Sequence, residues 1–436
     1  MDTFKEKILG TKEVSVWGIG YLGYTKVLKL QSKGFLIKVY DITDSGFNEK
    51  KKNGSYPDKI MSFRWSKSGS VPPLDICRFK LVSIEEMFTT NLHIFAFPLT
   101  YKGGEKRYLG KVAQLFVKYK ENLKDALVIF QSAGPPGTID HSFIKILKKN
   151  KVQCCVATAF RSDWSLEEFL REQKRRVISG MNSKSIQKIR FFYDLLDIKY
   201  KVLKNIKEAE IYENARNGLQ YIATVFINQL AVAYQGINIR SMTEYLLEDI
   251  ELNESHLCIG AGGYKMPYFI QSILEGSENP SALSLIQEVH KINLSLIIAY
   301  ADAIIKRGIR SVAILGLSVK GNQKSIDFSP SVILAEYLSS SGIIVYIDEP
   351  LYNKIEILEI LPTCKPFDIF TDKVFIEALF VMNDHNKFKF ITQNDIKQFK
   401  LDNIPVIIDN VPLFNNYTFG LSTIYHAIGD GKIKIL

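Results

Sequence analysis

The chain has few cysteines, and their arrangement matches neither a metal centre nor a disulfide framework. It holds five cysteines in 436 residues; no two are spaced as a CxxC pair, and their number is odd. Metal sites and disulfide scaffolds need clustered or regularly spaced cysteines, whereas scattered ones are typical of a reducing compartment. We therefore predict no metal site and no disulfides.

Secretory and membrane-spanning signals are also missing from the sequence. The first ten residues, MDTFKEKILG, lack the apolar core of a signal peptide. No run approaches the roughly 20 apolar residues that a membrane span needs. We expect a cytoplasmic protein that does not enter a membrane.

The net charge of +10 does not indicate a nucleic-acid partner. The lysines are dispersed through amphipathic helical patterns, and the densest groups, at 49–52 and 148–151, are typical of solvated faces. We therefore expect no nucleic-acid binding. A phosphorylated small substrate needs only a few of these cations.

Two segments alternate apolar strand-like runs with helical patterns, which is typical of a doubly wound parallel sheet. The expected strands of the first are Glu13–Gly18, Ile37–Tyr40, His93–Phe97 and Ala126–Gln131. Those of the second are Arg310–Gly316, Ile343–Ile347, Leu379–Met382 and Val406–Asp409, with a helix over Ser331–Ser340. The fold class is therefore α/β, with two Rossmann-like domains over residues 1–207 and 308–436.

An all-helical segment, residues 208–307, joins these two domains. Residues Glu208–Gly236 run without proline, with apolar positions at helical spacing, and predict one long helix. Further helices are expected over Ser241–Asp249 and Ser281–Arg307. Since the long helix is apolar on more than one side, we expect it to form a homodimer interface.

The first strand leads into a glycine-rich turn that predicts dinucleotide binding. Residues Val14–Gly23 read VSVWGIGYLG, in which Gly18, Gly20 and Gly23 form a GxGxxG motif and Tyr21 and Leu22 begin a helix. These glycines permit a tight turn, the approach of a pyrophosphate and close helix packing. Asp41 ends the next strand, where a carboxylate accepts hydrogen bonds from ribose hydroxyls and repels a 2′-phosphate. The pattern favours NAD over NADP.

Several motifs stand in order along the whole chain: the GxGYxG loop, Phe97-Pro98, QSAGPPGT at 131–138, RVISG at 176–180, the central helix with Asn217, HLCIGAGGYKMPYF at 256–269, and GLSVKGNQKSIDFSPS at 316–331. Together they resemble the nucleotide-sugar 6-dehydrogenase family of UDP-glucose and UDP-N-acetylmannosamine dehydrogenases. The resemblance implies an NAD-dependent enzyme of polysaccharide biosynthesis. It adds Pro98, Ser132 and Thr138 to the cofactor site and Gly260, Gly262, Gly263 and Lys320 to the substrate site.

The residues that carry the family's chemistry are changed in this chain. In the family, a cysteine captures the aldehyde between two hydride transfers, but Lys265 occupies its position. Glu213 replaces the lysine of the central helix, and Tyr268 replaces an aspartate. A looser alignment places the family's glutamate on Thr158. Cys258, seven residues before Lys265, could serve only if the loop were rebuilt, so we interpret it as a buried structural thiol.

The substrate-binding positions are altered as well. Lys320 is retained, but Asp327 and the turn Asp409–Pro412 replace segments that carry arginines in the family. Neither aspartate nor valine can make a guanidinium's bidentate contacts to phosphate. A nucleotide-like ligand remains plausible, but specificity for UDP does not follow.

These departures leave several functions open. The first is an NAD-dependent oxidation of an alcohol group on a sugar nucleotide or related phosphorylated sugar, in a single two-electron step. In it Lys265 is general base or electrophile, Asn217 orients the substrate oxygen and Glu213 tunes Lys265. The alternatives are a non-catalytic homologue that binds NAD or a nucleotide as a partner or regulator, and an epimerase with tightly held NAD. Lys265 could also be a solvated bystander in a loop that has drifted.

Overall fold

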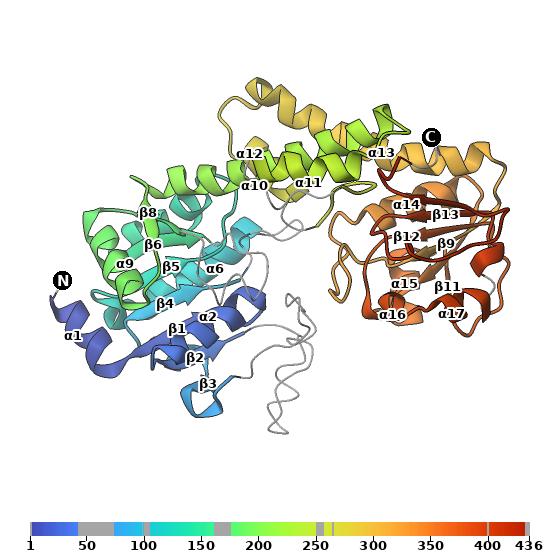
Figure 1. Cartoon of the computed structure of the whole chain (residues 1–436). Helices are drawn as coiled ribbons and strands as arrows, with labels where there is room; N and C mark the ends of the chain where they lie inside the picture. The colour runs from blue at the N-terminus through green and yellow to red at the C-terminus, as the bar shows by residue number, and fades with distance from the viewer. Residues whose placement is uncertain are drawn as a thin grey trace. The chain divides into compact units, whose positions relative to one another are not determined.

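The computed structural model describes residues 2–41, 74–97, 99, 105–160, 176–249, 257–263, 266–398 and 401–431. These residues form two compact units (Figure 1). The first contains Met1–Ala215 and Ser272–Glu278, and the second contains Arg216–Gln271 and Asn279–Leu436. The three-part division expected from the sequence stays a prediction, and the long helix contributes residues to both units.

The first unit is built on an eight-stranded sheet of order β3-β2-β1-β4-β5-β6-β7-β8. All neighbouring strands are parallel except β6 and β7, which are antiparallel. The strands are β1 Glu13–Trp17, β2 Leu36–Tyr40, β3 Phe79–Leu81, β4 Leu92–Phe95, β5 Leu127–Phe130, β6 Cys155–Phe160, β7 Arg176–Gly180 and β8 Tyr200–Val202. The four strands expected from the sequence are thus present.

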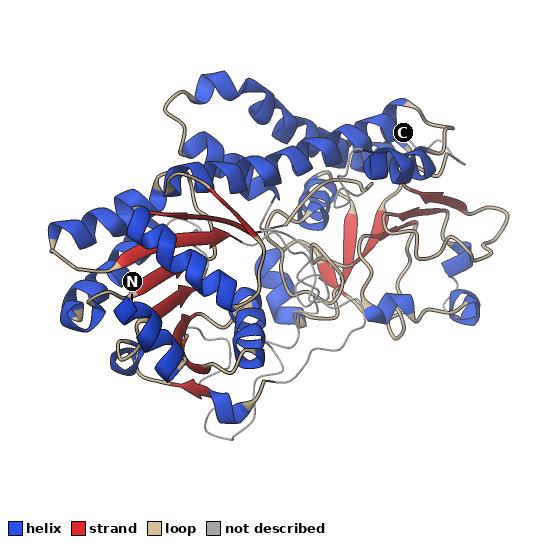
Figure 2. Cartoon of the chain, turned by 60° about the vertical axis from the view of Figure 1, so that its left-hand side comes forward, coloured by secondary structure: helices blue, strands red, loops and turns tan. Residues whose placement is uncertain are grey.

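Helices cover both faces of this sheet (Figure 2). They are α1 Asp2–Thr11, α2 Tyr21–Ser32, α5 Ile84–Met87, α6 Glu105–Lys118, α7 Lys145–Lys149 and α9 Ser183–Leu195. On one face, Val16 and Ile94 share a core with Phe4 of α1 and Phe192 of α9. On the other, Phe95 packs edge-to-face on Phe116 of α6. Because both faces are buried, the central strands are apolar at nearly every position.

The second unit contains a six-stranded, wholly parallel sheet of order β11-β10-β9-β12-β13-β14. Its strands are β9 Ser311–Leu315, β10 Ile344–Asp348, β11 Lys365–Pro366, β12 Ala378–Val381, β13 Val406–Asp409 and β14 Ile424–Ala427. Val312 and Ile314 face one apolar core and Ala313 and Leu315 another, since side chains alternate between the faces of a strand. The second expected sheet is confirmed.

The remaining helices include the helical segments expected from the sequence. The long one is α10 Ile206–Ala233, followed by α11 Ile239–Asp249, α12 Met266–Glu275, α13 Ser284–Lys306, α14 Pro330–Ser340, α15 Lys354–Ile360, α16 Asn386–Lys389 and α17 Gln393–Gln398. A 3-10 turn, Pro280–Leu283, precedes α13 where a continuous helix was expected. Pro280 occupies its first position, where a missing amide donor is tolerated.

One expectation about membrane segments needs correction. Within the described residues, the helical stretch Pro280–Lys306 is long and apolar enough to cross a membrane by length and composition alone. The helices of soluble cores meet the same two criteria. In this stretch Ile297, Tyr300 and Ile304 belong to the apolar core of the second unit, while 22% of its most apolar 18-residue window is buried.

Candidate functional site

The glycine-rich turn after β1 has the geometry of a dinucleotide-binding loop. Gly18 adopts a φ of +91°, a conformation that L side chains rarely adopt, and its amide donates to the Tyr40 carbonyl at 2.9 Å. A β-carbon on Gly23 would overlap the Gly18 carbonyl, so only glycine lets α2 pack this closely on the turn. The sequence motif therefore performs the packing roles predicted for its first and third glycines.

The start of α2 faces open space, as an anion-binding helix N-terminus requires. Gly20 is its N-cap and provides no side-chain hydrogen bond, and a β-carbon on Gly20 would meet nothing within 4 Å. Tyr21 and Leu22 form the first helical positions. Backbone amides at such an uncapped N-terminus favour a phosphate. Of the other predicted cofactor residues, Pro98 lies outside the described residues.

Asp41 connects the end of β2 to this turn. Its carboxylate accepts a hydrogen bond from the Ile19 amide at 2.7 Å. The side chain is partly exposed at the carboxyl edge of the sheet, next to the glycine turn. The structure thus brings the predicted acid and the predicted loop together, in the arrangement that binds an adenosine ribose.

A second loop, residues 131–139, follows β5 and contains the predicted residues Ser132 and Thr138. Two buried side chains of α10 hold it. Glu210 accepts from the amides of Gly137 at 2.7 Å and Ile139 at 3.1 Å, and Asn214 donates to the Gly134 carbonyl at 3.0 Å. Burial raises the pKa of Glu210 to about 8, against the two backbone donors, which lower it. Neither Glu210 nor Asn214 was among the predicted site residues.

The predicted catalytic residues of α10 lie one turn apart and are both buried. Glu213 is 5% exposed and Asn217 is fully buried. Lys265 falls outside the described residues, so the pairing of Glu213 with Lys265 stays a prediction. Tyr268, on α12, is partly buried and packs edge-to-face on Phe269 at a centroid distance of 6.0 Å.

Thr158 lies inside the first sheet. It belongs to β6, is fully buried, and its hydroxyl lies 2.7 Å from the Ser179 hydroxyl of β7. The two hydroxyls satisfy each other across the antiparallel pair. This contact gives Thr158 a structural role inside the sheet.

Tight packing explains why the loop at 257–263 is rich in glycine. A β-carbon on Gly260 would overlap the Ile297 side chain, and one on Gly262 would overlap the Phe328 carbonyl and Pro330. Gly263 has a φ of +95° and its amide donates to the Asp327 carbonyl at 3.0 Å. These contacts fix the shape of the loop; its predicted role in substrate binding stays a prediction.

Cys258, at the start of that loop, is held as a neutral thiol. Its amide donates to the Asn228 side chain at 2.9 Å, and the same side chain donates to the sulfur at 3.5 Å. Burial raises the thiol's pKa, so it is protonated at neutral pH. Because the thiolate is the nucleophile, these contacts favour the interpretation of Cys258 as a structural thiol.

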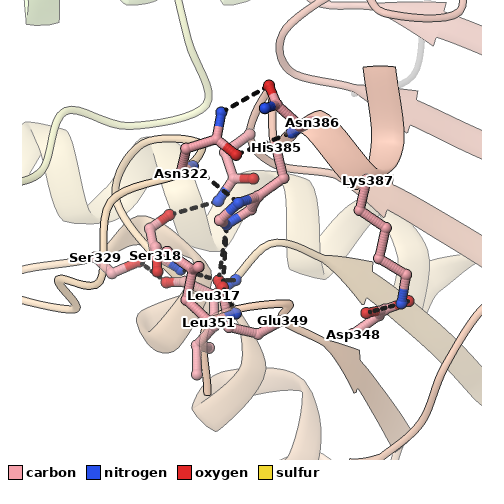
Figure 3. A network of polar contacts seen from close by, with 11 residues as sticks. Leu317, Ser318, Asn322, Ser329, Asp348, Glu349, Leu351, His385, Asn386 and Lys387 are labelled. Carbon is pink, nitrogen blue, oxygen red and sulfur yellow. Dashed lines mark hydrogen bonds and ion pairs between the residues drawn. The ribbon is translucent and has the colours of Figure 1, made fainter. Parts of the chain in front are cut away.

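In the second unit, the carboxyl ends of β9, β10 and β12 meet in a polar network that sequence reasoning missed (Figure 3). Glu349, after β10, accepts from the amides of Leu317 and Ser318, both at 2.8 Å. His385, after β12, lies beside Glu349. Lys320, the predicted substrate contact, is exposed on the loop after β9 that also carries Leu317 and Ser318. The only sequence signal was the position of these residues directly after apolar strands.

The turn after β13 also has a structural role. The Asn410 side chain accepts from the Ile259 amide at 2.7 Å and donates to the Met382 carbonyl at 2.9 Å. Asp409 accepts from the Phe414 amide at 2.8 Å and from the Tyr425 hydroxyl at 2.9 Å.

Within the described part of the chain, no group of three histidine, cysteine or acidic residues could hold a metal ion.

Comparisons with known proteins relate the whole chain to one group of enzymes. It is 24% identical to the UDP-N-acetyl-D-mannosamine dehydrogenase of Methanocaldococcus jannaschii, over 97% of each chain. It is 23% identical to the UDP-glucose 6-dehydrogenase of Rickettsia conorii, over 70% of this chain and 74% of the relative. No protein-family model matches the chain.

Solved structures show the same fold. The UDP-glucose dehydrogenase of Pyrobaculum islandicum aligns with a TM-score of 0.75 at 19% identity, covering 96% of this chain and 97% of that one. The UDP-D-ManNAc dehydrogenase of Pyrococcus horikoshii aligns with a TM-score of 0.71 at 20% identity, covering 97% and 100%. Both alignments extend over nearly the whole length.

Proposed function

Because this chain belongs to the nucleotide-sugar dehydrogenase family, we propose that it binds NAD and oxidises an alcohol group of a sugar nucleotide or related phosphorylated sugar in a single two-electron step. The observation that carries the proposal is the Asp41 carboxylate fixed on the Ile19 amide beside the uncapped start of α2. That arrangement fits a dinucleotide and disfavours a 2′-phosphate.

The cofactor residues of the chain have distinct tasks. Asp41 accepts from the adenosine ribose hydroxyls, and the start of α2 holds the pyrophosphate. The loop 131–139, held by Glu210 and Asn214, borders the other half of the cofactor. Bound NAD supplies the hydride acceptor.

The proposed reaction oxidises the alcohol once and ends at a carbonyl product. Lys265 stands where the family has its nucleophilic thiol, and an amine can accept the alcohol proton as a general base. Asn217 orients the substrate oxygen and Glu213 tunes Lys265. Cys258 is a protonated thiol whose backbone amide is hydrogen-bonded to Asn228. Because a protonated thiol does not trap an aldehyde, this supports a reaction in which no thiol takes part.

The stoichiometry of the reaction tests this proposal. The protein is incubated with NAD and a panel of sugar nucleotides, NADH is followed by absorbance, and the products are identified by mass spectrometry. We expect one NADH for each substrate consumed and a carbonyl product. Two NADH with a uronic acid would contradict the single-step assignment.

The non-catalytic alternative has support from one observation. Glu213 places a buried carboxylate where the family has a cation that steadies negative charge on the substrate oxygen. If no sugar nucleotide reduces NAD at any pH while NAD binds, a binding or regulatory protein becomes the better description.

A further inference from the structure

Gln131, the first residue after β5, has a buried side-chain amide that lacks a hydrogen-bond partner among the described residues. It is 2% exposed, and neither its side-chain nitrogen nor its side-chain oxygen has a partner in the described part of the chain. Among the described residues it is the one whose side-chain donor and acceptor are both unsatisfied. Each such group costs about 1–3 kcal/mol, so native proteins rarely keep one without a ligand or water to satisfy it.

The strand register places Gln131 near the glycine turn. Phe130 pairs with Phe95 of β4 and with Thr158 of β6, so the next position puts Gln131 between Ala96 and Ala159. The Gln131 backbone amide donates to the Phe95 carbonyl at 3.0 Å, which continues that register. The two alanines have no polar side-chain atoms to offer.

Ala96 in turn borders the turn itself. Its β-carbon would lie 3.5 Å from a β-carbon on Gly23, and its backbone lies against Gly18. Gln131 therefore lies two strand positions from the predicted pyrophosphate site after β1, with β4 between them, on the same edge of the sheet. The loop it begins is held by Glu210 and Asn214, and the Asn214 side-chain oxygen is also buried without a partner.

The strand order decides which half of a dinucleotide would reach Gln131. The order is β2-β1-β4-β5, with Asp41 after β2 and Gln131 after β5. These strands are separated by three spacings, about 14 Å. A dinucleotide crosses the carboxyl edge at the reversal between β1 and β4. With its adenosine ribose at Asp41, its nicotinamide riboside extends toward β5.

We propose that the Gln131 side-chain amide hydrogen-bonds the nicotinamide riboside half of the bound dinucleotide. This inference rests on the proposed function and adds a recognition residue to it. An amide donates and accepts, which matches the ribose hydroxyls and the carboxamide of that half. The cofactor satisfies the two groups that the protein leaves unpaired.

Calorimetry with NAD and AMP separates this role from a structural one. AMP contains the adenosine ribose that Asp41 contacts and lacks the nicotinamide riboside. We expect Gln131→Leu to weaken NAD about 10- to 100-fold, as for two lost hydrogen bonds, and to leave AMP affinity unchanged. Asp41→Ala is the matched control, since it should weaken both ligands.

The stability of the ligand-free protein gives a second readout. Replacing an unpartnered buried amide by an apolar side chain of similar size should raise the Tm, and Gln131→Met should behave like Gln131→Leu. If both variants bind NAD as the wild type does, water satisfies the amide and the proposal falls while the proposed function stands. Equal weakening of NAD and AMP with a lower Tm would assign Gln131 a purely structural role. A wild type that binds neither ligand would overturn both.

Discussion

His385 and Glu349 form a buried pair in which every ring nitrogen and carboxylate oxygen is engaged. The Asn322 amide donates to His385 Nδ1 at 2.8 Å, so His385 Nε2 carries the proton and faces Glu349 Oε1 at 3.0 Å (Figure 3). The side chains of both residues are at most 1% exposed. The pair connects the loops that follow β9, β10 and β12.

Glu349 should contribute to stability at neutral pH. Burial raises its pKa, but hydrogen bonds from His385, Ser318 and Leu351 outweigh burial and hold it below the ordinary 4.5. A depressed pKa gives stability that is present above pH 4.5 and is lost as pH falls through the folded value. Glu349→Gln should therefore lower the free energy of unfolding by about 1–3 kcal/mol at neutral pH, with a smaller difference in acid.

Urea unfolding at several pH values measures this difference. Glu359→Gln, on the exposed face of α15, is the matched control and should change little. If the loss of unfolding free energy in Glu349→Gln is the same at every pH, the shape and hydrogen bonds of Glu349 stabilise the protein, and its charge does not.

Asp41 should determine the affinity and the choice of cofactor. Asp41→Ala should weaken NAD by about 1–3 kcal/mol, because a charged acceptor for the ribose is lost. Asp41→Asn keeps an acceptor for the Ile19 amide and isolates the effect of charge. Calorimetry with NAD and NADP measures both effects, and the wild type should prefer NAD. Equal affinities of wild type and Asp41→Ala, or a wild-type preference for NADP, would contradict the assignment.

Substitution of Lys265 should show whether the chain is an enzyme or a binding protein. If it is the general base, activity should rise with pH through one ionisation, and Lys265→Met should lower kcat/KM about 10²- to 10⁴-fold. Lys291→Met, on an exposed side chain, is the control. Lys265→Cys alone should not restore a two-step reaction, because Glu213 and Tyr268 remain. Unchanged turnover in Lys265→Met would make Lys265 a bystander.

The long helix α10 should form a homodimer. Tyr212, Leu219 and Phe226 recur every seven residues along it, and each side chain is 44–63% exposed. Burying such a stripe against a second copy removes apolar surface from water. Light scattering should give about twice the 49.7 kDa chain mass at micromolar concentration.

The double variant Leu219→Asp/Phe226→Asp tests the stripe directly and should shift the protein toward monomer. Leu358→Asp, at an exposed leucine of α15, controls for the added charge. A wild-type monomer, or a double variant that keeps its dimer, would rule out this interface.

Sequence periodicity determined the architecture. Apolar runs predicted the central strands of both sheets and helical spacing predicted α10, because a strand buried on both faces needs apolar residues throughout. The GxGxxG motif and Asp41 predicted a loop and an acid that do meet, since their spacing is set by one strand-turn-helix-strand unit. Local patterns were sufficient where the contacts are local.

Only the tertiary structure decided which side chains, distant in sequence, form hydrogen bonds with the loops. Glu210 lies 73 residues from the Gly137 amide it holds, and Glu349 lies 36 residues from His385. No spacing rule links such partners, because parallel strands bring the ends of separate segments to one edge of a sheet. Strand pairing also placed Thr158 opposite Ser179 of the antiparallel β7 and put Gln131 between two alanines, where its side chain has no partner among the described residues. The sequence determined what each segment becomes, and packing decided which polar groups are satisfied and which remain for a ligand.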